Sequence, residues 1–280
     1  MTTLWDAVVI GGGAAGLFCA GVAGQLGKKV LVVDHAPVLG EKIRISGGGR
    51  CNFTNVHSSP AHFLSLNPHF VKSALARYPS KEFIKLVTAH GIGYHEKHQG
   101  QLFCDDSAKQ IVQMLLSECA KGKVTIRHPV VVQSITQEAD QWLVNIDGGQ
   151  IKTKSVVMAT GGLPVPAIGA SAYSLDIAKQ FGLSVVHPRP ALVPLSFTAE
   201  SFGSLSELAG LSVPVRIFSG IKGQRYGACQ FDEDLLLTHK GLSGPAVLQA
   251  SSYWVEGEAI NIDWLGAGNL SKSEIGRAHV

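Results

Sequence analysis

The sequence predicts an α/β fold with a small antiparallel meander, followed by a mainly β region, and three observations lead to this class. Apolar runs at residues 5–10 and 28–34 flank a glycine-rich turn and a helical stretch, which indicates a βαβ unit with a right-handed crossover. Alternating runs over residues 123–158 surround an Asp-Gly-Gly turn, which is typical of a meander that returns to the main sheet. The proline-rich segment 187–195 interrupts regular structure and predicts a domain boundary.

Helices are expected at three further places. The stretch "SKEFIKLVTAHG" has Ser80 as a candidate N-cap and Gly91 as a stop, and "DDSAKQIVQMLLSECAKG" closes at Gly122. The third, "GLSGPAVLQAS", has Ser243 as a candidate cap and Pro245 in its first turn. The first two have the apolar spacing of amphipathic surface helices.

The turn "VVIGGGAAG" carries a phosphate-binding pattern. Gly11, Gly13 and Gly16 fit G-x-G-x-x-G between a predicted strand and a predicted helix, where glycine permits the tight turn, the approach of phosphate and close helix packing. Asp34 ends the next strand, where an acid accepts hydrogen bonds from an adenosine ribose. The pattern favours a dinucleotide site over a glycine-rich core turn, and the acid disfavours a tightly held NADP.

Two further glycine clusters also follow predicted strands. The backbone N–H groups of residues 47–49 are suited to form an anion-accepting nest, with Arg50 adding a charge. The run "VVMATGG" at residues 156–162 ends a buried strand in small residues. A nicotinamide dehydrogenase rarely needs a second cluster, whereas FAD is longer and must be held along its ribityl chain and flavin. The clusters therefore favour FAD, and three unrelated tight turns are the alternative.

Composition excludes other classes. The chain has 280 residues and a net charge of +3 with no run of five basic residues, so nucleic-acid binding is unsupported and no nucleic-acid partner is expected. Five cysteines without a C-x-x-C pair argue against a disulfide framework and favour a reducing, cytoplasmic compartment. The apolar segment 7–24 holds six glycines and the phosphate pattern, so it is not expected to enter a membrane.

The sequence also resembles a known family. The strings "VVIGGGAAGLFCAG", "GEKIRISGGGRCNFTN", "VVMATGGLPVPAIGAS", "PRPALVPL" and "LTHKGLSGPAVLQASSYW" are similar to bacterial aminoacetone-oxidase-type FAD-binding flavoproteins, a family that includes a dehydro-bile-acid reductase. The resemblance runs from about Trp5 to Asp263. It implies a Rossmann-like FAD/NAD(P)-binding domain over residues 1–190, interrupted by a mainly β inserted domain over residues 191–273.

The resemblance also implies which residues line FAD. The first loop would hold the pyrophosphate and the second the flavin-side half, with Val132 contributing its backbone beside adenine. The full predicted set is Gly11, Gly13, Ala14, Ala15, Gly16, Asp34, Lys42, Gly49, Arg50, Cys51, Asn52, Thr54, Val132, Ala159, Thr160 and Gly161.

The sequence departs from the family pattern toward its C-terminus. Family members return from the inserted domain with a glycine-rich strand and helix that the chain lacks, so a truncated chain with two incomplete domains is expected. Residues 274–280, "EIGRAHV", look like a translated sequencing adapter and are interpreted as a scar. Such a chain is expected to be poorly soluble on its own and to hold FAD weakly.

No motif identifies a catalytic residue. Cys51 is a candidate redox thiol, although a packing role beside the cofactor is favoured. His239, in "LTHKG", is a candidate acid or base, and an exposed turn histidine fits equally well. The pair His95 and His98 lacks further ligands nearby in sequence, so no metal site is predicted.

The predicted function is an FAD-dependent oxidoreductase that exchanges a hydride between flavin N5 and a small organic substrate. NAD(P)H is a candidate transient electron donor. The sequence identifies neither the substrate, nor the direction of the reaction, nor the oligomeric state. One alternative is a dehydrogenase that uses NAD alone. The other is a flavin-bearing RNA- or protein-interaction protein related to the FAD proteins of tRNA modification.

Overall fold

The computed structural model describes residues 3–198, 202–220 and 227–265. The chain divides into two compact units, one made of residues 1–59 and 73–186 and the other of residues 60–72 and 187–280. The boundaries expected from the sequence, 1–190 and 191–273, remain a prediction. The interpreted scar at 274–280 lies outside the described residues.

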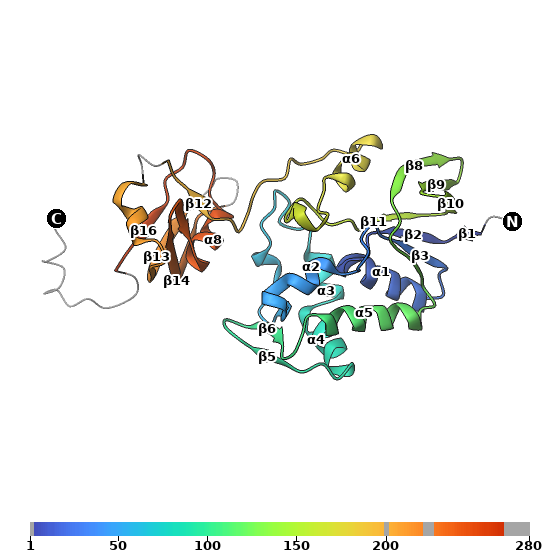
Figure 1. Ribbon diagram of the computed structural model, residues 1–280, viewed down its shortest axis with the longest axis horizontal. Helices are drawn as coiled ribbons and strands as arrows, with labels where there is room; N and C mark the ends of the chain where they lie inside the picture. The colour runs from blue at the N-terminus through green and yellow to red at the C-terminus, as the bar shows by residue number, and fades with distance from the viewer. Residues whose placement is uncertain (1–2, 199–201, 221–226, 266–280) are drawn as a thin grey trace, which may run out of the picture. The chain divides into compact units, whose positions relative to one another are not determined.

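A four-stranded parallel sheet forms the centre of the first unit (Figure 1). Its strands are β2 (Ala7–Ile10), β3 (Val30–Val33), β7 (Thr125–Arg127) and β11 (Val156–Met158), in the order β11-β2-β3-β7. Helix α1 (Ala14–Gln25) connects β2 to β3, which lie side by side in parallel. The predicted βαβ unit is therefore confirmed.

Alternate residues of these strands pack into two different cores. Val9 and Val32 are buried against α1 and α5 (Lys109–Lys121) on one face, while Val8 and Leu31 are buried on the other face. All four are fully buried, and each such side chain contributes about 1.5–3 kcal/mol of hydrophobic stabilisation. Burial on both faces explains why the strands are continuously apolar in sequence.

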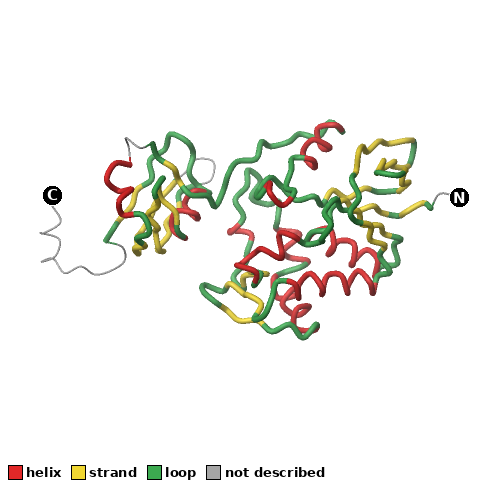
Figure 2. The backbone as a smooth tube through the Cα atoms, in the orientation of Figure 1, coloured by secondary structure: helices red, strands yellow, loops and turns green. Residues whose placement is uncertain are grey.

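The second face of the parallel sheet is covered by an antiparallel meander (Figure 2). Strands β8 (Val132–Glu138), β9 (Gln141–Ile146) and β10 (Gly149–Thr153) pair in sequence order, and β1 (Leu4–Trp5) adds to β10 in parallel. Gly148 lies between β9 and β10 with φ +85°, the left-handed conformation expected of a glycine turn. The predicted meander and the α/β fold class are confirmed.

A third, smaller sheet and several helices complete the first unit. The sheet contains β4 (Asn52–Asn55), β6 (Gln101–Cys104) and β5 (Tyr94–Glu96), in that order. The remaining helices that begin in this part of the chain are α2 (Glu41–Ile45), α3 (Lys72–Arg77), α4 (Ser80–Ala89) and α6 (Tyr173–Gln180). None of the described helices is long and apolar enough to cross a bilayer.

The second unit is mainly β, as the sequence predicts. Its sheet has the order β12-β15-β14-β13-β16, and α8 (Pro245–Ser251) packs against it. The strands are β12 (Leu195–Ser196), β13 (Ser212–Ser219), β14 (Cys229–Thr238), β15 (Gly241–Ser243) and β16 (Asn261–Asp263). Its core contains Val215, Ile217, Leu235 and Ala246.

Two helix caps differ from the sequence prediction. Gly244, rather than Ser243, is the N-cap of α8. Its φ is +89° and a Cβ there would lie 2.7 Å from the carbonyl oxygen of Asp234, which requires glycine at this position. Pro79 is the N-cap of α4, and Ser80 lies inside the helix. In both cases the backbone conformation, and not a side-chain hydrogen bond, decides where the helix begins.

Candidate cofactor-binding site

The first glycine turn lies between the end of β2 and the start of α1, and two of its glycines are required by close backbone packing. A Cβ on Gly11 would lie 2.3 Å from the carbonyl oxygen of Ala159, and one on Gly16 would lie 1.8 Å from the carbonyl oxygen of Gly11. Gly11 also has φ +114°. No larger residue fits at either position without moving the backbone.

Gly13 is different, because nothing in the protein requires a glycine there. Its φ of −86° is accessible to any residue, and a Cβ would meet no heavy atom within 4 Å. Gly13 instead lines an open cavity at the N-terminus of α1. The first turn of α1 holds no acidic side chain, so the free N–H groups and the positive end of the helix dipole remain available to an anion.

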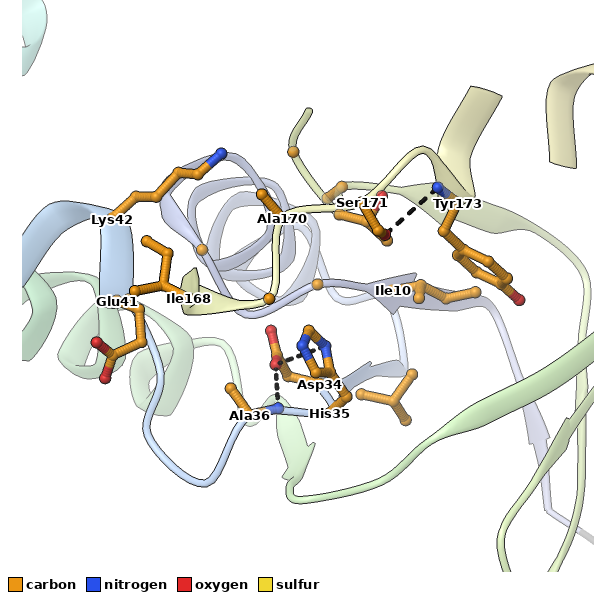
Figure 3. A pocket seen from close by; sticks show the side chains of 18 of the residues that line it. Ile10, Asp34, His35, Ala36, Glu41, Lys42, Ile168, Ala170, Ser171 and Tyr173 are labelled. Carbon is orange, nitrogen blue, oxygen red and sulfur yellow. Dashed lines mark hydrogen bonds and ion pairs between the residues drawn. The ribbon is translucent and has the colours of Figure 1, made fainter. Parts of the chain in front are cut away.

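The cavity is about 770 Å³, within the range of small-molecule and cofactor sites. It lies at the carboxyl ends of β2, β3 and β11, where open α/β sheets bind ligands (Figure 3). Ten of the sixteen predicted cofactor residues line it: Gly11, Gly13, Ala14, Ala15, Asp34, Lys42, Val132, Ala159, Thr160 and Gly161. Residues from five separate stretches of sequence thus meet at one site.

Asp34 combines a structural role with a position at the cavity. One carboxylate oxygen accepts the N–H of Gly12 at 2.5 Å. The other accepts the N–H of Ala36 at 2.7 Å (Figure 3). The imidazole of His35 lies 3.6 Å away. A carboxylate has about four acceptor positions, so acceptor positions remain beyond these two bonds. The arrangement suits ribose hydroxyl groups.

Two buried polar atoms of the cavity wall fit a bound cofactor. The hydroxyl groups of Thr160 and Tyr173 are buried without a hydrogen-bond partner among the described residues, and both residues line the cavity. Burial raises the pKa of Tyr173, so its hydroxyl stays protonated at neutral pH and can donate a hydrogen bond. Unsatisfied buried hydroxyls are costly, and polar atoms of a ligand would satisfy them.

Lys42 adds a positive charge to the cavity wall from α2. Its ammonium group donates to the carbonyl oxygen of Gly162 at 3.4 Å and lies 3.7 Å from where a Cβ on Gly161 would be. Gly161 has φ +77°. The residues that follow β11 and those of α2 therefore meet, although more than one hundred positions separate them in the sequence.

The sequence prediction missed several cavity residues. His35, Val130, Ile168 and Tyr173 line the cavity but match no fingerprint position. The one usable signal was Gly169 in the quoted "PAIGAS" string, whose φ is +84° and whose Cβ would lie 2.4 Å from the His35 ring. This contact brings residues 168–171 toward Asp34.

The second glycine cluster does not line the cavity. Gly47, Gly48 and Gly49 have φ values of +56°, +65° and +83°, and Gly49 accepts the N–H of Ala108 at 2.7 Å. Arg50 donates from its guanidinium to the carbonyl oxygen of Asp105. The predicted cofactor residues outside the cavity lining are Gly16, Gly49, Arg50, Cys51, Asn52 and Thr54. Their contact with the flavin half remains a prediction.

The two weak catalytic candidates lie in different units. Cys51 is buried with φ +53°, and burial raises the pKa of its thiol despite a hydrogen bond involving Ser46. His239 is exposed in the turn between β14 and β15. Within the described ranges there is no group of three or more His, Cys, Asp or Glu side chains suited to a metal ion.

Comparison with known proteins adds a family and several named relatives. The HI0933-like protein Rossmann domain matches residues 5–276. The ribosomal RNA dihydrouridine synthase of Escherichia coli K12 is 49% identical over 261 residues, which cover 93% of this chain and 64% of that protein. The protein of the same name from Haemophilus influenzae is 46% identical over 99% of this chain and 68% of its own length. The chain thus spans about two thirds of these relatives.

A more distant relative has a different substrate in its name. The 3-dehydro-bile acid Δ(4,6)-reductase of Clostridium scindens is 25% identical over 89% of this chain and 60% of that protein.

Proposed function

Because the chain belongs to the HI0933-like family of FAD-binding Rossmann proteins, we propose that the protein reduces a uracil base of ribosomal RNA to dihydrouridine. The observation that carries this proposal is the 49% identity, over 93% of the chain, to a protein of that name. The proposal corresponds to the RNA-related alternative of the sequence analysis. It also places the activity in the cytoplasm, where ribosomal RNA is found.

The chemistry of the named reactions supports a reductive direction. Dihydrouridine differs from uridine by two hydrogens across a carbon–carbon double bond that is conjugated to a carbonyl group. The name of the bile-acid reductase also describes reduction of double bonds conjugated to a ketone. In uracil, such a reduction adds a hydride to the carbon β to the carbonyl and a proton to the α carbon. We propose NAD(P)H as the donor of the two electrons.

FAD, when bound and reduced, supplies the hydride. In this proposal the residues of the cavity hold FAD and disfavour NADP. The N-terminus of α1 and the open space at Gly13 suit the pyrophosphate, and Asp34 suits the adenosine ribose. Thr160 and Tyr173 offer buried hydroxyl groups to polar atoms of the ligand. A carboxylate at position 34 disfavours a 2′-phosphate, so the cavity favours FAD over NADP.

A direct assay tests the proposal. Ribosomal RNA from cells that lack the gene is incubated with the flavin-loaded protein and NADPH, and its nucleosides are analysed by mass spectrometry. We expect uridine that has gained two hydrogens at one site, and no such product with Gly13→Val. Flavin-loaded protein that yields no dihydrouridine would contradict the proposal.

The same assay distinguishes a second candidate, which the bile-acid relative favours. If a conjugated steroid dienone reoxidises the reduced flavin while RNA does not, the substrate is a small enone.

A further inference from the structure

The second glycine turn lies one short helix away from the cavity. The first residues of α2, from Glu41 to Ile43, line the cavity. The helix has five residues and spans roughly 7.5 Å, and the turn Ser46–Gly49 follows it directly. FAD extends beyond its adenosine diphosphate half by a ribityl chain and the flavin. A cofactor held in the cavity is therefore long enough to reach this turn.

An aromatic ring connects the turn to a histidine. A Cβ on Gly47 would lie 2.7 Å from Cε1 of Phe103, on β6, so this ring packs directly on the turn. His95, on β5, pairs with Phe103 across the sheet. The two rings stack, with centroids 6.4 Å apart and planes inclined by 20°. The sheet and the turn therefore hold the imidazole in a defined orientation.

Asp105 fixes the same imidazole through a hydrogen bond. Its carboxylate oxygen lies 2.7 Å from Nδ1 of His95. The N–H of Asp105 donates to the carbonyl of Gly93 at 2.9 Å, and the guanidinium of Arg50 donates to the carbonyl of Asp105. Nε2 of His95 has no hydrogen-bond partner among the described residues, and the side chain is 49% exposed. His95 can therefore exchange a proton through Nε2 while Asp105 holds the ring.

A second histidine–carboxylate pair of the same length is arranged differently. Nε2 of His90 lies 2.7 Å from a carboxylate oxygen of Glu118, so the hydrogen bond occupies Nε2 itself. The His90 side chain is 18% exposed, and Glu118 also accepts hydrogen bonds from Lys121 and Gln25. Packing between α1, α4 and α5 explains this pair. The His95 pair instead leaves Nε2 accessible beside the second turn.

We propose that His95 is the proton donor of the reduction, acting through Nε2 on a uracil ring at the flavin, with Asp105 as its positioning residue. The inference rests on the proposed function. The hydride brings two electrons from the reduced cofactor and forms the bond at the β carbon. The carbon–carbon π bond breaks, and its electron pair binds the Nε2 proton at the α carbon. The neutral imidazole then regains a proton from water. Histidine is the side chain used most often for such transfers near neutral pH.

The first test locates His95 relative to the flavin and needs no turnover. Histidine rings are isotope-labelled for NMR, and the His95 signal is identified by its loss in His95→Gln. We expect this signal to shift when FAD binds but not when ADP binds, because ADP occupies only the cavity at the first turn. The His90 signal, identified through His90→Gln, should be the same with either ligand.

The second test isolates the step that consumes the proton. Flavin-loaded protein is reduced with dithionite, freed of the excess and mixed, without oxygen, with ribosomal RNA from cells that lack the gene. Flavin absorbance then reports reoxidation. We expect His95→Gln to slow reoxidation by RNA at least about a hundredfold. Reoxidation by ferricyanide, which accepts electrons without a proton, should be unchanged.

Further variants separate proton transfer from a structural effect. Asp105→Asn should slow reoxidation by RNA about tenfold, because the imidazole loses the carboxylate that positions it. Imidazole in solution should restore part of the rate to His95→Ala, where it has space to bind. His90→Gln is the matched control and should reoxidise at the unaltered rate. Thermal unfolding of the His95 and Asp105 variants should match that of the unaltered protein, since exposed pairs contribute little.

Three results would overturn the inference. The first is a His95 signal that does not respond to FAD. The second is a His95→Gln protein that RNA reoxidises at the unaltered rate. The third is equal slowing with RNA and with ferricyanide, because the substitution would then disturb the cofactor and not the proton transfer.

The failure of this inference differs from that of the proposed function. Dihydrouridine formed at full rate by His95→Gln would contradict only the assignment of the proton donor. An unaltered reduced protein that RNA does not reoxidise would contradict the proposed function. The response of the His95 signal to FAD would then still decide whether this imidazole lies at the flavin.

Discussion

Two turns of the first unit each contain three consecutive glycines, at residues 11–13 and 47–49, and they use glycine for different reasons. In the first turn Gly11 is required by backbone contact with Ala159, while Gly13 faces open space at the cavity. In the second turn all three glycines have left-handed φ values, and Gly47 also packs against Phe103. Backbone conformation and packing within the protein therefore explain the glycines of the second turn without a ligand.

The comparison shows how a ligand requirement can be separated from a folding requirement. A glycine whose missing Cβ would collide with backbone is needed by the fold, and a glycine with positive φ is needed by the chain conformation. Gly13 meets neither condition. Its identity is explained by the space that a cofactor needs, so the first turn carries the stronger argument for a binding site.

Gly16→Val should have the largest effect, because it places a side chain where the folded backbone leaves no space. A Cβ at this position would lie 1.8 Å from the carbonyl oxygen of Gly11 and 3.3 Å from the Cβ of Ala159. We expect a loss of more than about 3 kcal/mol in the free energy of unfolding, measured by urea denaturation. Gly48→Ala is the matched control and should cost about 1 kcal/mol, since a Cβ there meets only open space at φ +65°. A normally stable Gly16→Val protein would show that the turn is packed differently.

Gly13→Val should separate binding from folding. The free energy of unfolding of the apoprotein should fall by less than about 1 kcal/mol, because a Cβ at this position has no heavy atom within 4 Å. FAD affinity should fall at least about a hundredfold, equivalent to ~2.7 kcal/mol, as measured by quenching of flavin fluorescence. Full FAD affinity in this variant would mean that the cavity is not the pyrophosphate site.

Asp34→Ala and Arg50→Ala compare the two turns directly. The adenosine-side assignment predicts that Asp34→Ala weakens FAD by about 1–3 kcal/mol and leaves the flavin reduction potential unchanged. The flavin-side assignment of the second turn predicts that Arg50→Ala lowers that potential by roughly 30 mV, or ~1.4 kcal/mol for two electrons. Potentiometry that gives the same potential for both variants would remove the second turn from the flavin site.

Helix α5 supports both turns, and its contact with α1 predicts a pH dependence. Burial raises the pKa of Glu118, but hydrogen bonds from Lys121, Gln25 and His90 outweigh burial and lower it to about 2. A carboxyl group whose pKa is lower in the folded than in the unfolded protein stabilises the fold at pH values above the unfolded pKa. This stabilisation is lost as pH falls from about 5 toward 2.

Glu118→Gln tests this contact and should have the smallest effect. It should cost about 1 kcal/mol at pH 7 and progressively less as pH falls toward 2, as measured by denaturation at each pH. Glu82→Gln is a control, because Glu82 makes an exposed pair with Lys85 on α4 that contributes little. Parallel stability curves for the unaltered protein and Glu118→Gln across this range would contradict the assigned cause.

Much of the fold was predictable because its signals are local. The strand–turn–helix pattern of residues 5–34 and the turn of the meander appear directly in the sequence, and the expectation of an FAD-binding family is confirmed. The resemblance to a bile-acid reductase is found at 25% identity. The finer expectation of an aminoacetone oxidase is not supported by the two relatives above 45%, which have a different name.

The parts that sequence reasoning missed depend on distant contacts. Tyr173 and His35 reach the cavity because residues 168–171 fold back against the turn after β3, and no periodicity indicates this. The exposed aromatic rings of residues 60–72 became apparent only when the three cores were known.

The measurement that tests the central claim most directly is a competition titration of FAD from the protein with the two halves of the cofactor. The cavity at the first turn has the features of an adenosine diphosphate site, formed by the α1 N-terminus and Asp34. We therefore predict that ADP displaces FAD from the unaltered protein, whereas FMN at the same concentration displaces FAD poorly, and that Gly13→Val weakens ADP and FAD alike in direct titrations. Displacement by FMN and not by ADP would contradict the account.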